Sequence, residues 1–328
     1  MDWIPVADDP DRFDYPICPD RKDYFSETAR LAGEWILKKV RLNKIMKKIL
    51  LILGAVMVII VLVITIGKIS FDKKVTGEVG ILTEEGSKTP SKTFSFDDLE
   101  GLPEPVQRYF KYVLKDGQEH IKFTRLKQVG EFRMKENQPW MPVHAEQYFT
   151  TEDPAFIWRV KLAMAPFIWI EGRDIYHQGR GNMLIKLLST ITVADAKGSE
   201  MDISSLIRFL SEAPWFPTAL LPGDYIAWEE IDSDSARVVI RDKGYTASGI
   251  FTFNEKGEIL RFVTNDRYME AGGKYFKEKW TAHYREYREF EGMNIPTEGE
   301  VEWNLSGRDL QYAKLTITDI QYNIAEKY

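Results

Sequence analysis

Residues 155–164 read AFIWRVKLAM, and the alternation within this stretch decides the fold class. Apolar side chains occupy every second position, and Arg159 and Lys161 lie between them. Successive side chains of a β-strand point to opposite faces of a sheet. The stretch therefore predicts a strand with one apolar face and one solvated face. The apolar face is formed by Phe156, Trp158, Val160, Leu162 and Met164.

Further stretches with the same period follow along the chain, and turn motifs such as QGRGN, NEKGE and EAGGK separate them. So many consecutive strands with short connections predict an antiparallel meander. Its apolar face must be covered, so we expect a strongly curved antiparallel sheet, a half-barrel closed by a few helices. The predicted fold class is mainly β (α+β). The strands are expected from about residue 120, and at 155–164, 167–177, 182–194, 224–231, 236–241, 246–253, 258–268, 274–287, 297–305 and 310–322.

Two stretches have helical spacing instead, one before the predicted sheet and one that interrupts it. Residues 99–117, LEGLPEPVQRYFKYVLKDG, place prolines at a helix start and Gly117 at its end, with apolar residues three or four positions apart between them. In the second stretch, Asp202 is a suitable N-cap, an apolar face continues to Leu210, and Pro214 would end the helix.

Residues 49–67, ILLILGAVMVIIVLVITIG, carry no charge and are long enough to cross a bilayer as a helix. Basic residues are denser before this run than after it, which predicts a cytoplasmic N-terminus and an extracytoplasmic C-terminal domain. A cleavable signal peptide beginning at Met46 is the alternative, although VITIGKIS has no clear cleavage site. The expected organisation is a tail over 1–48, native or an artefactual extension, a transmembrane helix over 49–67, a polar linker over 68–95 and the half-barrel domain over 96–328.

Composition and motifs argue against several classes of function. The net charge of −6 is spread without a basic stripe, so no nucleic-acid partner is expected. The single cysteine, Cys18, allows no internal disulfide. The histidines are scattered and match no metal-ligand spacing, and neither a nucleophile elbow nor a phosphate-binding loop is present. We therefore assign no catalytic residue, metal or cofactor.

Residues 208–222, RFLSEAPWFPTALLP, combine a charged pair with aromatic side chains and prolines. Arg208 and Glu212 are four residues apart, close enough to pair on a helix. The segment after Pro214 has too many prolines for a regular element and too many apolar residues for a solvated loop. It should cover either the protein core or a ligand cavity. The candidate ligand-binding residues are Trp158, Trp169, Arg208, Glu212, Trp215 and Phe216.

Five stretches in order, LPEPVQRYFKYVL, FIWRVKLAM, RFLSEAPWFPTALLP, AWEEIDSDSARVVI and WTAHYREYREFEGMNIPTEGEVEWNL, resemble a family of membrane-anchored bacterial and archaeal proteins defined only as a domain of unknown function. The resemblance covers about residues 98–324. It implies a fold similar to that of the periplasmic lipoprotein carriers, in which a bent antiparallel sheet forms an incomplete barrel and helices close an apolar cavity. It implies no catalytic residues.

The sequence thus predicts a membrane-anchored, extracytoplasmic module that binds a lipid or another apolar ligand, because the expected helices are too few to cover such a sheet. An envelope enzyme that uses the carboxyl group of Glu212 for acid/base chemistry is a second interpretation. A structural interaction protein whose cavity is filled by its own side chains is a third.

Overall fold

The protein is described here by a computed structural model covering residues 21–328. The chain divides into two units, one ending at Leu62 and one comprising Val63–Tyr328. The first unit is helical wherever it is described, and the second contains the strands. The beginning of the predicted tail, with Cys18, lies outside the described residues.

Helix α1 (Arg21–Lys88) contains the predicted span and is long and apolar enough to cross a membrane. The expected linker over 68–95 differs from the structure, because the helix continues through Lys88. The segment expected as a linker is polar in composition, but it contains four apolar residues with spacings of four, four and three positions. This is the pattern of a packed helix face. The four residues form an apolar stripe and are all buried: Phe71, Val75, Val79 and Leu82.

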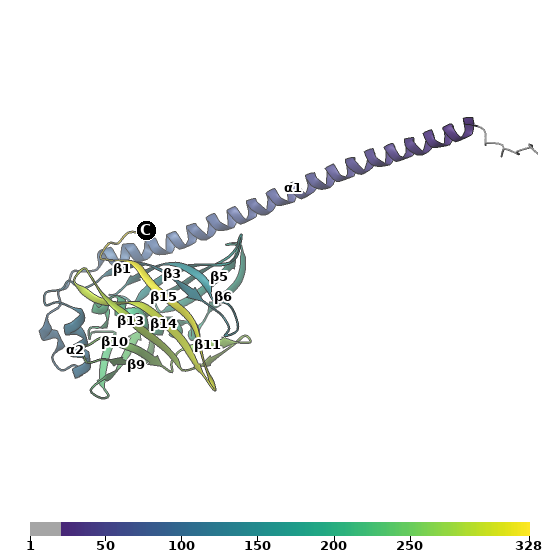
Figure 1. Ribbon diagram of the computed structural model, residues 1–328. Helices are drawn as coiled ribbons and strands as arrows, with labels where there is room; N and C mark the ends of the chain where they lie inside the picture. Colours follow the sequence, from purple (N-terminus) through teal and green to yellow (C-terminus); the bar gives the residue numbers. More distant parts are fainter. Residues whose placement is uncertain (1–20) are drawn as a thin grey trace, which may run out of the picture. The chain divides into compact units, whose positions relative to one another are not determined.

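The expected antiparallel sheet is confirmed. In the described chain it has 13 strands in the order β6-β5-β4-β3-β2-β1-β15-β14-β13-β10-β9-β8-β7, and its edge strands do not pair to close a barrel (Figure 1). A separate hairpin is formed by β11 (Tyr268–Ala271) and β12 (Lys274–Lys277). The sheet strands are β1 (Phe123–Phe132), β2 (Met141–Thr150), β3 (Ala155–Ala165), β4 (Ile168–His177), β5 (Arg180–Leu187), β6 (Ile191–Lys197), β7 (Ile226–Glu230), β8 (Ser235–Asp242), β9 (Tyr245–Phe253), β10 (Ile259–Thr264), β13 (Trp280–Phe290), β14 (Met293–Leu305) and β15 (Arg308–Tyr322).

Two expected strands are each interrupted. The run over 182–194 becomes β5 and β6, because Leu188 and Ser189 adopt positive φ angles of 52° and 59° and the backbone reverses there. The run over 274–287 becomes β12 and β13, which are separated by Glu278 and Lys279 without a reversal, since the Glu278 N–H still donates to the Arg267 oxygen at 3.1 Å. Periodicity alone detects neither interruption.

The expected helices are present as α2 (Glu104–Val113) and α3 (Ser199–Glu212). Asp202 is not the N-cap, since α3 begins three residues earlier and Gly198 occupies that position. The carboxylate of Asp202 instead accepts hydrogen bonds from the Gly181 backbone N–H and the Tyr245 hydroxyl. Three 3₁₀ helices were not predicted: η1 (Phe96–Leu99), η2 (Ala213–Trp215) and η3 (Pro217–Leu220).

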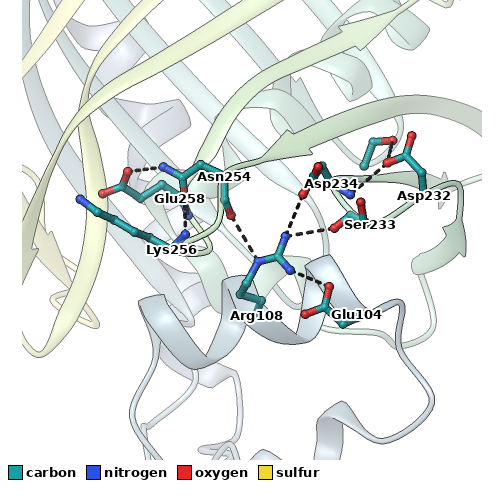
Figure 2. A network of polar contacts seen from close by, with 9 residues as sticks. Glu104, Arg108, Asp232, Ser233, Asp234, Asn254, Lys256 and Glu258 are labelled. Carbon is teal, nitrogen blue, oxygen red and sulfur yellow. Dashed lines mark hydrogen bonds and ion pairs between the residues drawn. The ribbon is translucent and has the colours of Figure 1, made fainter.

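Helix α2 is joined to two hairpin loops by Arg108 (Figure 2). The Arg108 guanidinium donates hydrogen bonds to the backbone oxygens of Ser233 and Asn254, at 3.0 and 3.2 Å. It also pairs with Glu104 of the same helix at 2.6 Å. The second loop is itself ordered by the Asn254 side-chain oxygen, which accepts from the Glu258 N–H. Because these contacts already occupy the guanidinium, we interpret the network as structural.

Each face of the sheet contributes side chains to a buried apolar cluster. On the inner face, Phe156 belongs to the main core with residues of α2, α3, η2 and η3. On the outer face, the neighbouring Ile157 packs with Val75 and Val79 of α1. The side chains of adjacent strand residues point to opposite faces, so α3 and the end of α1 cover different sides of the same strands.

Three acidic side chains of α1 pair with basic side chains on the outer face of β3 and β4. The pairs are Asp72 with Arg159, Glu78 with Arg173 at 3.1 Å, and Glu85 with His177 at 3.0 Å. Arg173 is almost fully buried, so the pair with Glu78 is shielded from water. The polar contacts thus place the last part of α1 in one register along the sheet.

The gap between the edges of the sheet is bridged within residues 63–328. Helix α3 contacts β5 and β6 on one side and β8 and β9 on the other. The Tyr176 hydroxyl donates to Asp242 at 2.7 Å, and a Cβ on Gly179 would lie 2.6 Å from the Cβ of Lys243. Two hairpin turns from distant parts of the chain therefore meet where the sheet stays open.

Candidate functional site

A row of polar and aromatic side chains crosses the inner face on three neighbouring strands. Gln147 of β2 lies directly opposite Trp158 of β3, and Trp158 lies directly opposite Asp174 of β4. Trp158 shares its face with Phe156, so the row faces the interior of the half-barrel. Gln128 of β1 extends the row, because its side-chain oxygen accepts a hydrogen bond from Trp158 Nε1 at 3.0 Å.

Helix α3 presents Arg208 and Glu212 to this row. The expected pair between them is present, with Arg208 Nε donating to Glu212 Oε1 at 2.9 Å. Arg208 Nη1 donates to Asp174 Oδ2 at 2.7 Å, and Gln147 Nε2 donates to Glu212 Oε2 at 2.6 Å. We call the six residues the inner polar cluster: Gln128, Gln147, Trp158, Asp174, Arg208 and Glu212.

The charges of the inner polar cluster are removed from water. Loss of hydration raises the pKa of Glu212, although the charge of Arg208 and the hydrogen bonds from Arg208 and Gln147 oppose this shift. Burial alone would lower the pKa of Arg208, but the carboxylates of Glu212 and Asp174 outweigh it, so the net shift is upward. Arg208 is thus a permanent cation shared by two acids.

Several atoms of the cluster are buried and, within residues 21–328, have no hydrogen-bond partner: Gln128 Nε2, Gln147 Oε1 and Asp174 Oδ1. Leaving such an atom unpaired costs about 1–3 kcal/mol. The set includes both a donor and acceptors. A small polar group, from water or from a ligand, would therefore be stabilised if it reached them.

Next to the cluster, the inner face becomes apolar, with a buried centre and a partly buried rim. Val160 and Leu162 continue the face of Trp158 along β3, and Trp158 packs against them. The backbone of α3 runs mainly along β4, β5, β6, β8 and β9, and it reaches β2 and β3 through the side chains of Glu212 and Arg208. We call the apolar area the inner apolar patch: Val143, Ala145, Val160 and Leu162, with the partly buried Phe132, Met141, Ile170 and Leu315 around them.

The structure brings only some of the candidate residues to this site. Trp158, Arg208 and Glu212 form its centre. Trp215 is buried, with Nε1 unpartnered in the described chain and its ring 3.5 Å from where a Cβ on Gly299 would lie. Phe216 lies in the main core, with its ring centroid 4.4 Å from that of Phe149.

Trp169 is not at this site. It faces Ala163 across the β3–β4 pairing, in the phase of the outer face, and its Nε1 donates to the Ser189 hydroxyl at 3.0 Å. A ligand-binding role for Trp169 at the cluster is therefore not supported by its position.

The sequence analysis missed Gln128, Gln147 and Asp174. A signal for Gln147 was present in AEQYF, residues 145–149, because the amide occupies the same strand phase as Ala145 and Phe149. A polar residue in the apolar phase of a strand is often buried with a partner. The partners, however, come from other strands and from α3.

Two surface hollows lie away from the inner polar cluster. One lies beside α2 and is lined by Arg108, Lys111 and Lys256, among others. The other lies near the end of α1, between the turns of two hairpins, and includes His177, Lys243 and Tyr245. Within residues 21–328, no group of His, Cys, Asp and Glu side chains is arranged to hold a metal ion.

Comparisons with known proteins give one family and several similar structures, two of which are described here. A crystal structure of a DUF1329 family protein from Desulfovibrio piger matches with a TM-score of 0.38 and 10% identity, over 63% of this chain and 88% of that one. A LolA superfamily protein from Nitrosomonas europaea matches with a TM-score of 0.35 and 11% identity, over 67% and 92% of the two chains. No curated protein matches. Residues 92–315 match the model of a family of unknown function, so the chain belongs to the DUF6544 family.

Proposed function

We propose that this protein is a membrane-anchored binding module that holds a lipid or another apolar molecule against the inner face of its sheet. The observation that carries the proposal is the adjacency of two surfaces. The inner apolar patch would take the apolar body of the ligand, and the unpartnered atoms of the inner polar cluster would take a polar end. The space beneath α3 is filled by the protein's own side chains, such as Phe209 and Phe216, so the ligand would lie beyond this helix.

The charges of the cluster favour a ligand whose polar end is uncharged. Arg208 is already neutralised by Asp174 and Glu212, at 2.7 and 2.9 Å. An added anion would meet two carboxylates and lose its own hydration, which costs several kcal/mol in a buried site. A hydroxyl or amide group could instead accept from Gln128 Nε2 and donate to Gln147 Oε1 without adding charge.

Native mass spectrometry of the full chain in detergent, with dodecanol or dodecanoate added, tests this proposal. We expect dodecanol to be retained and dodecanoate to bind at least about tenfold more weakly, since burial of an unpaired charge exceeds the 1.4 kcal/mol that a factor of ten requires. Gln128→Leu should weaken retention, whereas Gln321→Leu, on the outer face beside Arg125, should not. Failure of the parent protein to retain either compound would contradict the binding function.

The anchor is proposed to be the apolar run over 49–67, with the N-terminus in the cytoplasm and the sheet domain outside. The denser basic residues before the run support this orientation. In intact cells, external protease should digest the domain after residue 70 and spare a tag at Met1. The reverse pattern would overturn the orientation and with it the extracytoplasmic location.

A second candidate function, an envelope enzyme, is favoured by one observation, the raised pKa of the buried Glu212 carboxyl group. A carboxyl group whose pKa is raised can serve as a general acid or base. Both of its oxygens, however, already accept hydrogen bonds, from Arg208 and Gln147. A screen of lipid and glycan substrates with the parent protein and Glu212→Gln decides between the two functions. An activity that the parent protein has and the variant lacks would favour the enzyme.

A further inference from the structure

Large apolar side chains are exposed at one end of the sheet, where β3 and β4 continue beyond Leu162 and Ile170 of the inner apolar patch. The most exposed is Phe167, at 92%, in the turn between β3 and β4. Its backbone has a positive φ of 65°. Glycine or asparagine suits that conformation better than a bulky residue, so the turn itself gives no reason for a phenyl ring. The exposed residues at this end are Met164, Phe167, Ile168, Ile191 and Val193.

Backbone pairing places these residues together. Ala165 pairs with Ile168 across the β3–β4 turn, and the Leu188 N–H donates to the Trp169 oxygen at 2.9 Å. Leu187 pairs with Ile191 across the next turn. The two turns are therefore neighbours at the same edge, and their apolar side chains form one exposed group, which we call the apolar tip.

Helix α1 meets the domain at this same end. A Cβ on Gly67 would collide with the Thr190 Oγ1, so the helix backbone passes directly against the β5–β6 turn. Gly67 is the last residue of the uncharged run over 49–67. The contacts with the outer face follow immediately, from Phe71 onward. The point where the apolar run ends is thus the point where the apolar tip lies.

We propose that the apolar tip is inserted into the interfacial region of the bilayer that α1 crosses, so that the domain is held to the membrane at two places. This inference rests on the proposed anchor. Trp169 beside the tip, and Lys68, Lys73 and Lys74 just after Gly67, are residue types that favour the membrane interface. Insertion is favoured because it removes apolar surface from water. Alternative occupants are a second protein or a copy of this chain.

The test uses the full chain in phosphatidylcholine vesicles, with Cys18 replaced by serine and one nitroxide label introduced at a time. The test position is Phe167→Cys. The matched control is Lys243→Cys, which lies near Glu85 of α1, about 27 Å further along the helix from Gly67 at 1.5 Å per residue. A third label, at Val58→Cys, reports whether the apolar run is in the bilayer.

Electron paramagnetic resonance then measures the accessibility of each label to oxygen, which partitions into lipid, and to a water-soluble nickel chelate. We expect the label at residue 167 to be accessible to oxygen and protected from the chelate, and the label at 243 to be open to the chelate. Equal chelate accessibility at 167 and 243, or a label at 167 shielded from both reagents as in a protein contact, would overturn the proposal. If the label at 58 is itself in water, the anchor fails instead.

Discussion

The guanidinium carbon of Arg208 lies 4.4 Å from the ring centroid of Trp158. Its nitrogens simultaneously reach Asp174 and Glu212, so the cation is held by a ring face and by two carboxylates. These contacts come from β3, β4 and α3, and they join the helix to the row on the sheet. Because these side chains are largely buried, removing one charged member would leave another charge without its partner. An unpaired charge in such a site is strongly unfavourable.

Arg208→Met should therefore lower the free energy of unfolding by about 3–5 kcal/mol, since it leaves two buried carboxylates without their cation. The triple variant Arg208→Met with Asp174→Leu and Glu212→Leu should recover most of this loss, because no buried charge remains. Arg285→Met is the control. Arg285 itself is exposed, so its pair with Glu300 should contribute no more than about 1 kcal/mol. Urea unfolding in mild detergent gives the comparison, and an equal effect of both single variants would contradict our interpretation of the cluster.

The stability of the protein should depend on pH through Glu212. Its pKa in the folded state is raised above the reference value of 4.5, so folding takes up a proton between these two values. The stabilising contribution is fully present below the unfolded pKa and is lost as the pH rises through the folded pKa. The unfolding free energy of the parent protein relative to Glu212→Gln should therefore rise as the pH falls from about 8 to about 5. A difference that is constant, or that falls, would show that the carboxyl group is not perturbed in this direction.

Trp215→Ala should lower the free energy of unfolding by about 3–5 kcal/mol, because the ring is buried against the sheet. Phe276→Ala, in the exposed β12, should change it by less than about 0.5 kcal/mol. Ligand titrations on the same variants add a second result. If Trp215 also lines the ligand site, binding of dodecanol should weaken beyond what the loss of stability explains, whereas unchanged binding to the folded fraction would restrict Trp215 to packing.

The sheet domain should require the end of α1 to fold stably. A chain that begins at residue 69 keeps the buried stripe of Phe71, Val75, Val79 and Leu82, whereas a chain that begins at residue 90 exposes the outer face around Ile157. Each lost side chain contributes about 1.5–3 kcal/mol by burial. We expect the shorter chain to melt at a clearly lower temperature and to aggregate. Equal melting temperatures in thermal scans by circular dichroism would show that the end of α1 does not stabilise the sheet domain.

The sequence by itself determined the features that depend on local pattern. Alternation in residues 155–164 and in later runs predicted the antiparallel strands, since the side-chain direction of a strand has a period of two. The helix after Pro103 and the helix ending before Pro214 were likewise encoded by spacing and by proline. The Arg208 and Glu212 pair followed from the helical repeat.

Only the tertiary structure decided which of these elements meet. Gln147 and Asp174 join one site because strand register aligns both with Trp158, and register is set by contacts between residues far apart in the chain. The stripe from Phe71 to Leu82 was concealed among polar residues, and its partner is the outer face of strands that occur much later. Trp215 and Phe216 are adjacent in sequence, yet one lies against Gly299 and the other against Phe149. Packing of distant segments, which no local pattern specifies, fixed these positions.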